Sequence, residues 1–137
     1  MGRVINTDSP AKERNQWRRT VAEALRHLMS KKELDDEAKD LAALVVIGLR
    51  GISDTIERTV EPWEKRNYYL KADRFRLEWE WSGGAAHRME ATIKADKWQE
   101  LPAQLAELMP HFADIRITKL MRSPETWAGC YRVLMGK

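Results

Sequence analysis

The sequence predicts a single all-α domain that spans residues 1–137 and folds as a bundle-like unit of four to five helices. Apolar side chains recur with a helical period along most of the chain, which is the first observation behind this prediction. The second is composition, because 43% hydrophobic and 33% charged residues are typical of a globular protein with a strongly solvated helical surface. The third is length, since 137 residues suffice to bury one core without disulfides.

The first helix is predicted from about Pro10 to Ser30. Asp8 and Ser9 precede Pro10, and this order is typical of a helix start, where a side chain caps the first turn and proline lacks an N–H that would be unpaired anyway. Apolar residues form one stripe of this helix: Trp17, Val21, Ala24, Leu25 and Leu28. Basic residues recur every seven positions on the other side: Lys12, Arg19 and Arg26.

A second helix is predicted to begin at the acidic cluster 34–37, because carboxylates stabilise the positive end of a helix dipole. The run from Leu41 to Leu49 is apolar on every side, which indicates a position in the middle of the bundle or at a subunit interface. Small side chains at Gly48, Gly51 and Thr55 share one side, where another helix could approach closely.

The segment from Trp63 to Trp81 fits two periods. As a helix that begins at Pro62, it has two opposed apolar faces and ends in a kink or break at the glycine pair 83–84. As a strand, its apolar residues alternate with charged ones from position 75, and the glycine pair would turn into a partner strand. The prediction is helix, and the alternative is an α+β fold with a β-hairpin at about residues 75–93.

Further elements are expected towards the C-terminus. Residues 96–99 resemble a capping box, and the apolar spacing from Leu101 to Phe112 predicts a helix that Pro110 helps to end. Ile115 and Ile117 indicate a short strand, and Ser123-Pro124-Glu125 is typical of one more helix start.

Two stretches carry a resemblance to a known group of proteins: Asn6-Thr7-Asp8-Ser9-Pro10 with Arg18-Arg19-Thr20, and Trp63-Glu64-Lys65-Arg66 with Lys71-Ala72-Asp73-Arg74-Phe75-Arg76. The chain resembles a group of small uncharacterised helical bacterial proteins over much of its first eighty residues. The resemblance implies a helical fold and carries over no activity and no site residue.

The residues of known catalytic and metal sites are not arranged in any familiar motif. His27, His87 and His111 lie in separate segments, and the glycine pair lacks the lysine of a phosphate-binding loop. We therefore expect no enzyme activity, no metal and no cofactor. The single cysteine, Cys130, excludes an intramolecular disulfide and fits a reducing compartment, so a cytoplasmic location is expected, with no membrane partner.

Six of the eleven aromatic residues lie between Trp63 and Trp81, where basic residues separate them. Aromatic and arginine side chains are enriched where proteins meet partners. We therefore predict a protein-interaction or assembly module that binds a protein partner or self-associates as a homo-oligomer. Its predicted partner surface comprises five residues: Trp63, Arg66, Tyr69, Phe75 and Trp79.

The alternative is nucleic-acid binding. Residues 1–32 carry eight basic and three acidic side chains, whereas residues 33–61 carry three basic and eight acidic ones. A basic ridge on the first helix would supply phosphate partners, and the segment 63–81 would supply aromatic rings on which bases stack. The candidate phosphate contacts are Arg14, Arg18, Arg19 and Arg26.

Overall fold

A computed structural model describes residues 9–136, which form helices and connecting loops with no strand among them. The α-helices are α1 (Pro10–Ser30), α2 (Asp36–Lys65), α3 (Tyr69–Trp79), α4 (Trp81–Lys94), α5 (Leu101–Leu108) and α6 (Cys130–Met135). Short 3-10 helices lie at Trp98–Glu100 (η2), Met109–Phe112 (η3) and Pro124–Thr126 (η4). The prediction of an all-α fold is confirmed, and the β-hairpin alternative at residues 75–93 is wrong.

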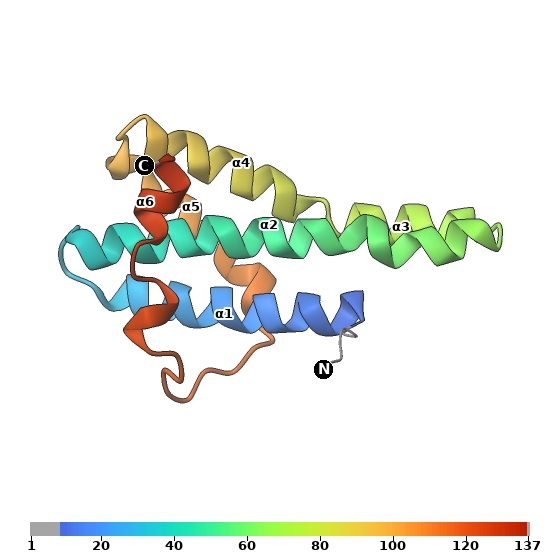
Figure 1. Cartoon of the computed structure of the whole chain (residues 1–137), viewed down its shortest axis with the longest axis horizontal. Coiled ribbons are helices and arrows are strands. Elements are labelled where there is room, and N and C mark those ends of the chain that lie inside the picture. The colour runs from blue at the N-terminus through green and yellow to red at the C-terminus, as the bar shows by residue number, and fades with distance from the viewer. Residues whose placement is uncertain (1–8, 137) are drawn as a thin grey trace.

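The long helix α2 forms the axis of the molecule (Figure 1). Helix α1 runs beside it, α4 packs along its other side, and α6 lies across the N-terminal part of α2. Helix α3 folds back along the C-terminal part of α2, so these two segments form a helical hairpin that reaches beyond the rest of the bundle.

Helix α1 has the predicted bounds. The hydroxyl oxygen of Ser9 accepts a hydrogen bond from the backbone N–H of Lys12, and Pro10 occupies the first turn. The other residue of the predicted start, Asp8, lies outside the described residues, as do Asn6 and Thr7. The carboxylate of Asp35 caps α2 by accepting a hydrogen bond from the backbone N–H of Ala38.

The apolar run of α2 is part of the core of the monomer. Residues 41–46 are all buried, because α1, α4 and α6 surround this part of the helix. The two glycines on its α1 side allow the close approach that the sequence predicted: a Cβ at Gly48 would overlap Val21, and one at Gly51 would overlap the indole of Trp17. The run therefore requires no second subunit to cover it.

The predicted break at Pro62 is wrong, because Pro62 is an exposed residue inside α2 and the helix continues to Lys65. The chain turns instead at Asn67, which adopts a left-handed conformation with φ of 65°. The backbone N–H of Asn67 donates to Glu64 O and that of Tyr68 donates to Trp63 O. This is a Schellman motif, and asparagine is one of the few residues that accept its left-handed position.

Three smaller predictions are also wrong. Gly83 and Gly84 lie inside α4, where Gly83 faces the Ser53 side chain of α2, and the break between helices falls at Glu80 instead. Asp96 caps no helix, because its carboxylate accepts from the indole N–H of Trp98. Ile115 and Ile117 form no strand; both are half-buried in a loop against the core.

Candidate interaction surface at the hairpin tip

The inner face of α3 packs against α2 and α1. Ala72 is fully buried, and Phe75 and Trp79 on the same face are half-buried. Leu70 and Leu77 point the other way and are 64% and 68% exposed. The division of this helix into two opposed apolar faces was predicted, and the structure assigns the face with Phe75 and Trp79 to the interior.

A buried cation connects the three helices at this point. The guanidinium of Arg14 donates hydrogen bonds of 3.1 Å to the hydroxyls of Thr55 and Thr59 on α2. It also lies over the rings of Phe75 and Trp79 of α3, at 4.8 and 5.1 Å from their centroids. Burial lowers the pKa of Arg14 from its ordinary value, but arginine stays charged in proteins. The cation therefore joins α1, α2 and α3 by directional contacts.

Arg76 fixes α3 to α2 on the flank. Its Nε and one terminal nitrogen donate to the two carboxylate oxygens of Glu57 at 2.9 Å, and the other terminal nitrogen lies 3.0 Å from Glu64. These hydrogen bonds lower the pKa of Glu57 and raise that of Arg76. The bidentate geometry sets the orientation of α3 as well as holding it.

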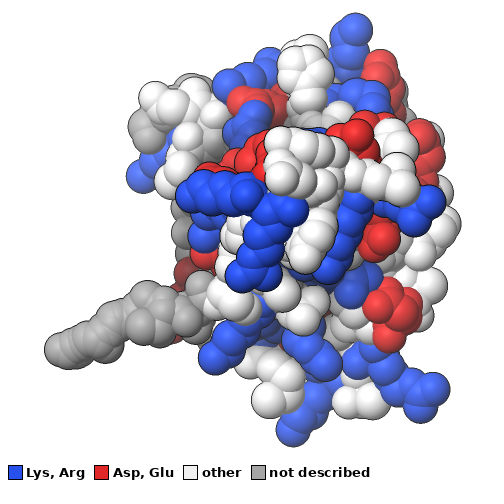
Figure 2. Space-filling model, turned by 90° about the vertical axis from the view of Figure 1, so that its right-hand side faces the viewer, with Lys and Arg blue, Asp and Glu red and all other residues white. Residues whose placement is uncertain are grey.

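We define the hairpin tip as residues 65–74, where α2 ends and α3 begins. Three consecutive large side chains stand out there: Tyr68, Tyr69 and Leu70 are 53%, 56% and 64% exposed. Four basic residues and one acidic residue, Asp73, share the tip; the basic ones are Lys65, Arg66, Lys71 and Arg74. Figure 2, which views the molecule from the side of the tip, shows a patch of other residues bordered by Lys and Arg side chains, with Asp and Glu side chains also beside it.

The cations of the tip differ in their partners. Lys65 pairs with Glu61 at 3.2 Å, and Lys71 lies 4.3 Å from the centroid of the Trp63 ring. Arg66 and Arg74 make no side-chain ion pair with any residue in the described range 9–136. Glu57, Glu64 and Asp73 lie against Arg76, and Glu61 lies against Lys65. Residues 65–74 themselves carry four basic side chains and one acidic one, a net charge of +3.

The five residues predicted as a partner surface are divided by the structure. Arg66 and Tyr69 lie exposed on the tip. Trp63 is half-buried beneath Lys71 and meets Phe75 edge to face, with centroids 5.4 Å apart. Phe75 and Trp79 face inward and hold α3 in place. Only the first two are available to a partner, and the other three position the hairpin.

The four arginines predicted as phosphate contacts do not form one surface. Arg14 is buried, with 7% of its surface exposed. Arg18 is engaged with η3 and the loop after it, at 2.6 Å from a carboxylate oxygen of Asp114 and 2.9 Å from the carbonyl oxygen of His111. Arg19 and Arg26 are exposed on α1. Two of the four predicted contacts therefore remain exposed on α1, and the three residues of its seven-residue basic repeat, Lys12, Arg19 and Arg26, are all exposed.

The five residues predicted as a partner surface do not include four exposed residues of the tip, although the segment 63–81 contains them: Lys65, Tyr68, Leu70 and Arg74. The prediction of one helix from Pro62 does not indicate that its first residues lie at a turn. The available signal was Asn67, a residue that ends helices in the left-handed conformation.

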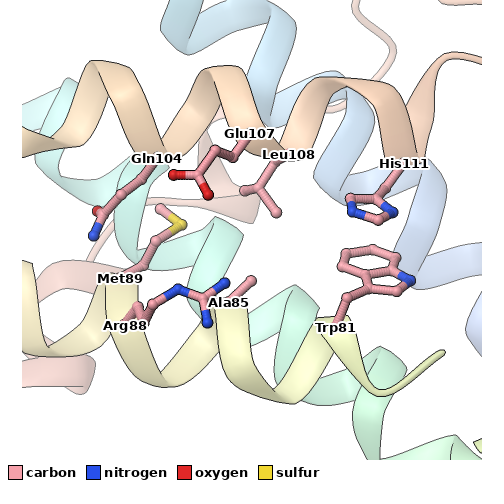
Figure 3. A pocket seen from close by; sticks show the side chains of 8 residues that line it. All are labelled: Trp81, Ala85, Arg88, Met89, Gln104, Glu107, Leu108 and His111. Carbon is pink, nitrogen blue, oxygen red and sulfur yellow. The ribbon is translucent and has the colours of Figure 1, made fainter. Parts of the chain in front are cut away.

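A small pocket between α4 and α5 combines charged and apolar side chains (Figure 3). The ring of His111 stacks on that of Trp81, with centroids 3.8 Å apart and planes 10° apart. Arg88 and Glu107 point towards one another across the opening. Burial, and then the nearby Arg18 charge, lower the pKa of His111. The cavity has a volume of about 80 Å³, too small for most ligands.

No group of three or more His, Cys, Asp or Glu side chains in residues 9–136 is arranged to hold a metal ion. Within the same range, none of the helices combines the length and the apolar character that a membrane span requires. Burial raises the pKa of the Cys130 thiol, which keeps it in its less reactive protonated form.

Comparison of this chain with protein-family models, with curated proteins and with solved structures found no match. The functional argument therefore depends on the site alone.

Proposed function

We propose that this protein is a non-enzymatic interaction module that presents the hairpin tip to a negatively charged macromolecule. The observation that carries the proposal is the combination of Tyr68, Tyr69 and Leu70, all more than half exposed, with four surrounding basic side chains. Aromatic anchors next to arginine are the residues that contribute most to binding at protein surfaces.

The apolar side chains of the tip contribute little to the fold. They contact solvent over more than half of their surface, whereas the inner face of α3 already supplies the packing against α2. Removal of apolar surface from water contributes about 25 cal/mol per Å² to a complex, before the entropic cost of association is subtracted. A partner that covers the tip would gain this energy without any rearrangement of the hairpin, which Arg14 and Arg76 hold in place.

Self-association through the tip is disfavoured by charge. Two tips in contact would bring eight basic and two acidic side chains together, and like charges at an interface cost free energy. The apolar run of α2, which had suggested a subunit interface, is covered within the monomer. The partner we propose is therefore a different, anionic molecule, in a reducing compartment such as the cytoplasm. An acidic protein surface and a nucleic acid both carry the charge that the tip requires.

Site-specific cross-linking in cells tests this proposal. In one version of the full-length chain, a photoreactive phenylalanine analogue replaces Tyr69 at the tip. In the other version, the analogue replaces Val133 on α6, which is 70% exposed. We expect covalent adducts from position 69 and few from position 133. Digestion of the adducts with nuclease or protease identifies the class of the partner.

The matched control carries Arg66→Glu and Arg74→Glu together with the analogue at position 69. We expect the adducts to disappear while circular dichroism and melting temperature stay unchanged, since both arginines are exposed. Equal adducts from the two positions, or adducts that survive the charge reversal, would contradict the proposal.

A further inference from the structure

We infer that the anionic partner is a single-stranded nucleic acid, whose bases stack on the tyrosines of the hairpin tip. This inference rests on the proposed function and names the partner of the same surface. It requires three features in one place: exposed aromatic rings, a polar group that can contact a base edge, and cations for the phosphates.

A shallow, open hollow at the tip supplies these features together. Six residues line it: Asn67, Tyr68, Tyr69, Leu70, Lys71 and Arg74. Its volume is about 660 Å³, much larger than that of the pocket between α4 and α5. Two tyrosine rings lie beside two cations there, which is the arrangement that nucleotide-binding surfaces use for base and phosphate.

The exposed amide of Asn67 can offer hydrogen-bond donors to a base edge. The hydroxyl of Tyr69 donates to the Asn67 amide oxygen at 3.2 Å, so the amide nitrogen is left with its two N–H donors. The left-handed conformation at the turn places this residue between the two helices of the hairpin. A base carbonyl or ring nitrogen next to Tyr68 or Tyr69 can accept from the amide without displacing a contact of the fold.

The distribution of charge favours a single strand over a duplex. A duplex hides the faces of its bases and is bound through a run of phosphate contacts. Two of the four arginines predicted as phosphate contacts on α1 do not extend such a run, because Arg14 is buried and Arg18 is engaged with Asp114. A single strand exposes its bases and needs few phosphate contacts, which matches a tip with four cations. An acidic protein would match the charge of the tip but would make less use of the open rings and the amide donors.

The inference predicts specific magnitudes. The tip can make at most four phosphate contacts. A plot of the logarithm of the association constant against the logarithm of the salt concentration should therefore have a slope of about −2.8 or shallower. Loss of stacking on the two tyrosines should weaken binding about 30-fold to 10⁴-fold at constant salt, at about 1–3 kcal/mol for each stacked base. The salt slope should stay the same in that case, because no cation is removed.

Fluorescence anisotropy with the full-length chain tests these expectations. The labelled probes are short oligo-dT, short oligo-rU and a duplex of equal length; polyphosphate and poly-L-glutamate compete as polyanions without bases. The variants are Tyr68→Leu with Tyr69→Leu, which keeps apolar volume but removes the rings, and Arg66→Glu with Arg74→Glu. Arg132→Glu on the exposed face of α6 is the control for charge. Circular dichroism confirms that each variant is folded.

We expect both single strands to bind more tightly than the duplex, the tyrosine variant to lose affinity for them, and the arginine variant to lose affinity and flatten the salt slope. A preference for oligo-rU over oligo-dT would identify RNA as the source, and the reverse would identify DNA. Arg132→Glu should change neither measurement.

Two results would overturn the inference. If poly-L-glutamate binds at the tip and the oligonucleotides do not respond to the tyrosine variant, the partner is an acidic protein and the proposed function stands. If no probe responds to the reversal of Arg66 and Arg74, the tip is not a contact surface for anions, and the proposed function fails with the inference.

Discussion

The N-terminal part of α2 and its C-terminal part are held in the molecule by different interactions. Residues 41–49 lie among α1, α4 and α6, and most of their side chains are fully buried. In residues 54–79, by contrast, few residues are buried. There α3 is held by the contacts of Arg14 with the rings of Phe75 and Trp79 and by the ion pairs of Arg76. We call these two parts the bundle end and the hairpin end.

The difference shows how a small domain can be stable and still expose apolar side chains. Apolar burial at the bundle end is strong and depends little on direction. The hydrogen bonds and cation–π contacts at the hairpin end are weaker and directional, so they orient α3 with little apolar surface. Tyr68, Tyr69 and Leu70 can therefore stay exposed at the tip.

The largest expected effect is the loss of a core side chain at the bundle end. Leu49→Ala should destabilise the protein by about 2–5 kcal/mol, because Leu49 is fully buried and its truncation leaves a cavity. Leu77→Ala at the hairpin end should change stability by less than about 0.5 kcal/mol, since Leu77 is 68% exposed. Urea denaturation followed by circular dichroism measures both. Similar losses in the two variants would contradict the distinction between the two ends.

The second effect concerns the close approach of α1 and α2. Gly48→Ala should cost about 1–3 kcal/mol, because the new methyl group would overlap the buried Val21 side chain. The matched control is Gly84→Ala in α4, where the nearest atom is a terminal nitrogen of Arg88 at 3.2 Å, which can move. We expect this control to be neutral or up to about 1 kcal/mol more stable, because alanine favours helix. Thermal melts of the two variants check the order.

The third effect should be confined to the hairpin. Arg14→Met removes two hydrogen bonds that a charged group donates and two cation–π contacts. We expect the free energy of docking of α3 onto α2 to become less favourable by about 1–3 kcal/mol. Hydrogen exchange should accelerate in α3 and stay slow in residues 41–49. Arg19→Met, at an exposed position of α1, should leave the hydrogen-exchange rates of α3 and of residues 41–49 unchanged. Equal acceleration at both ends would mean that Arg14 supports the whole bundle.

The smallest effect is that of the ion pairs on the flank of α3. Arg76→Gln should cost less than about 1 kcal/mol, because Glu57 is mostly exposed and solvent screens the pair. Glu57 has a pKa lowered by Arg76, so this contribution is present above the ordinary carboxyl pKa of 4.5 and is lost as pH falls through the lowered value. The pKa of Arg76 is raised, so the cation stays charged throughout this range.

Denaturation of wild type and Arg76→Gln at several pH values and salt concentrations tests this prediction. The difference between them should shrink in acid and in about 1 M salt, where the screening length is about 3 Å. A difference that persists in both conditions would show that Arg76 acts through packing and not through charge.

The sequence was sufficient for α1 and the N-terminal part of α2, and not for the hairpin end. Helices α1 and α2 were predicted because caps at Ser9 and Asp35 agree with a long apolar period. The turn at Asn67 was missed because a single left-handed asparagine is a weaker signal than Pro62, which the long helix tolerates. The interior position of Arg14 depends on three helices at once, and no local pattern reveals it. The exposed residues of the tip can be identified only when the position of the turn is known.

Chemical-shift mapping on the isotope-labelled chain tests the central claim most directly. The claim is that the hairpin tip, and no surface of the bundle end, meets the anionic partner. On titration with short oligo-rU, we predict shifts of the backbone amides of residues 65–74 and none in residues 36–49. Shifts centred on Arg19 and Arg26 of α1 or on α6, with the tip unchanged, would contradict the account.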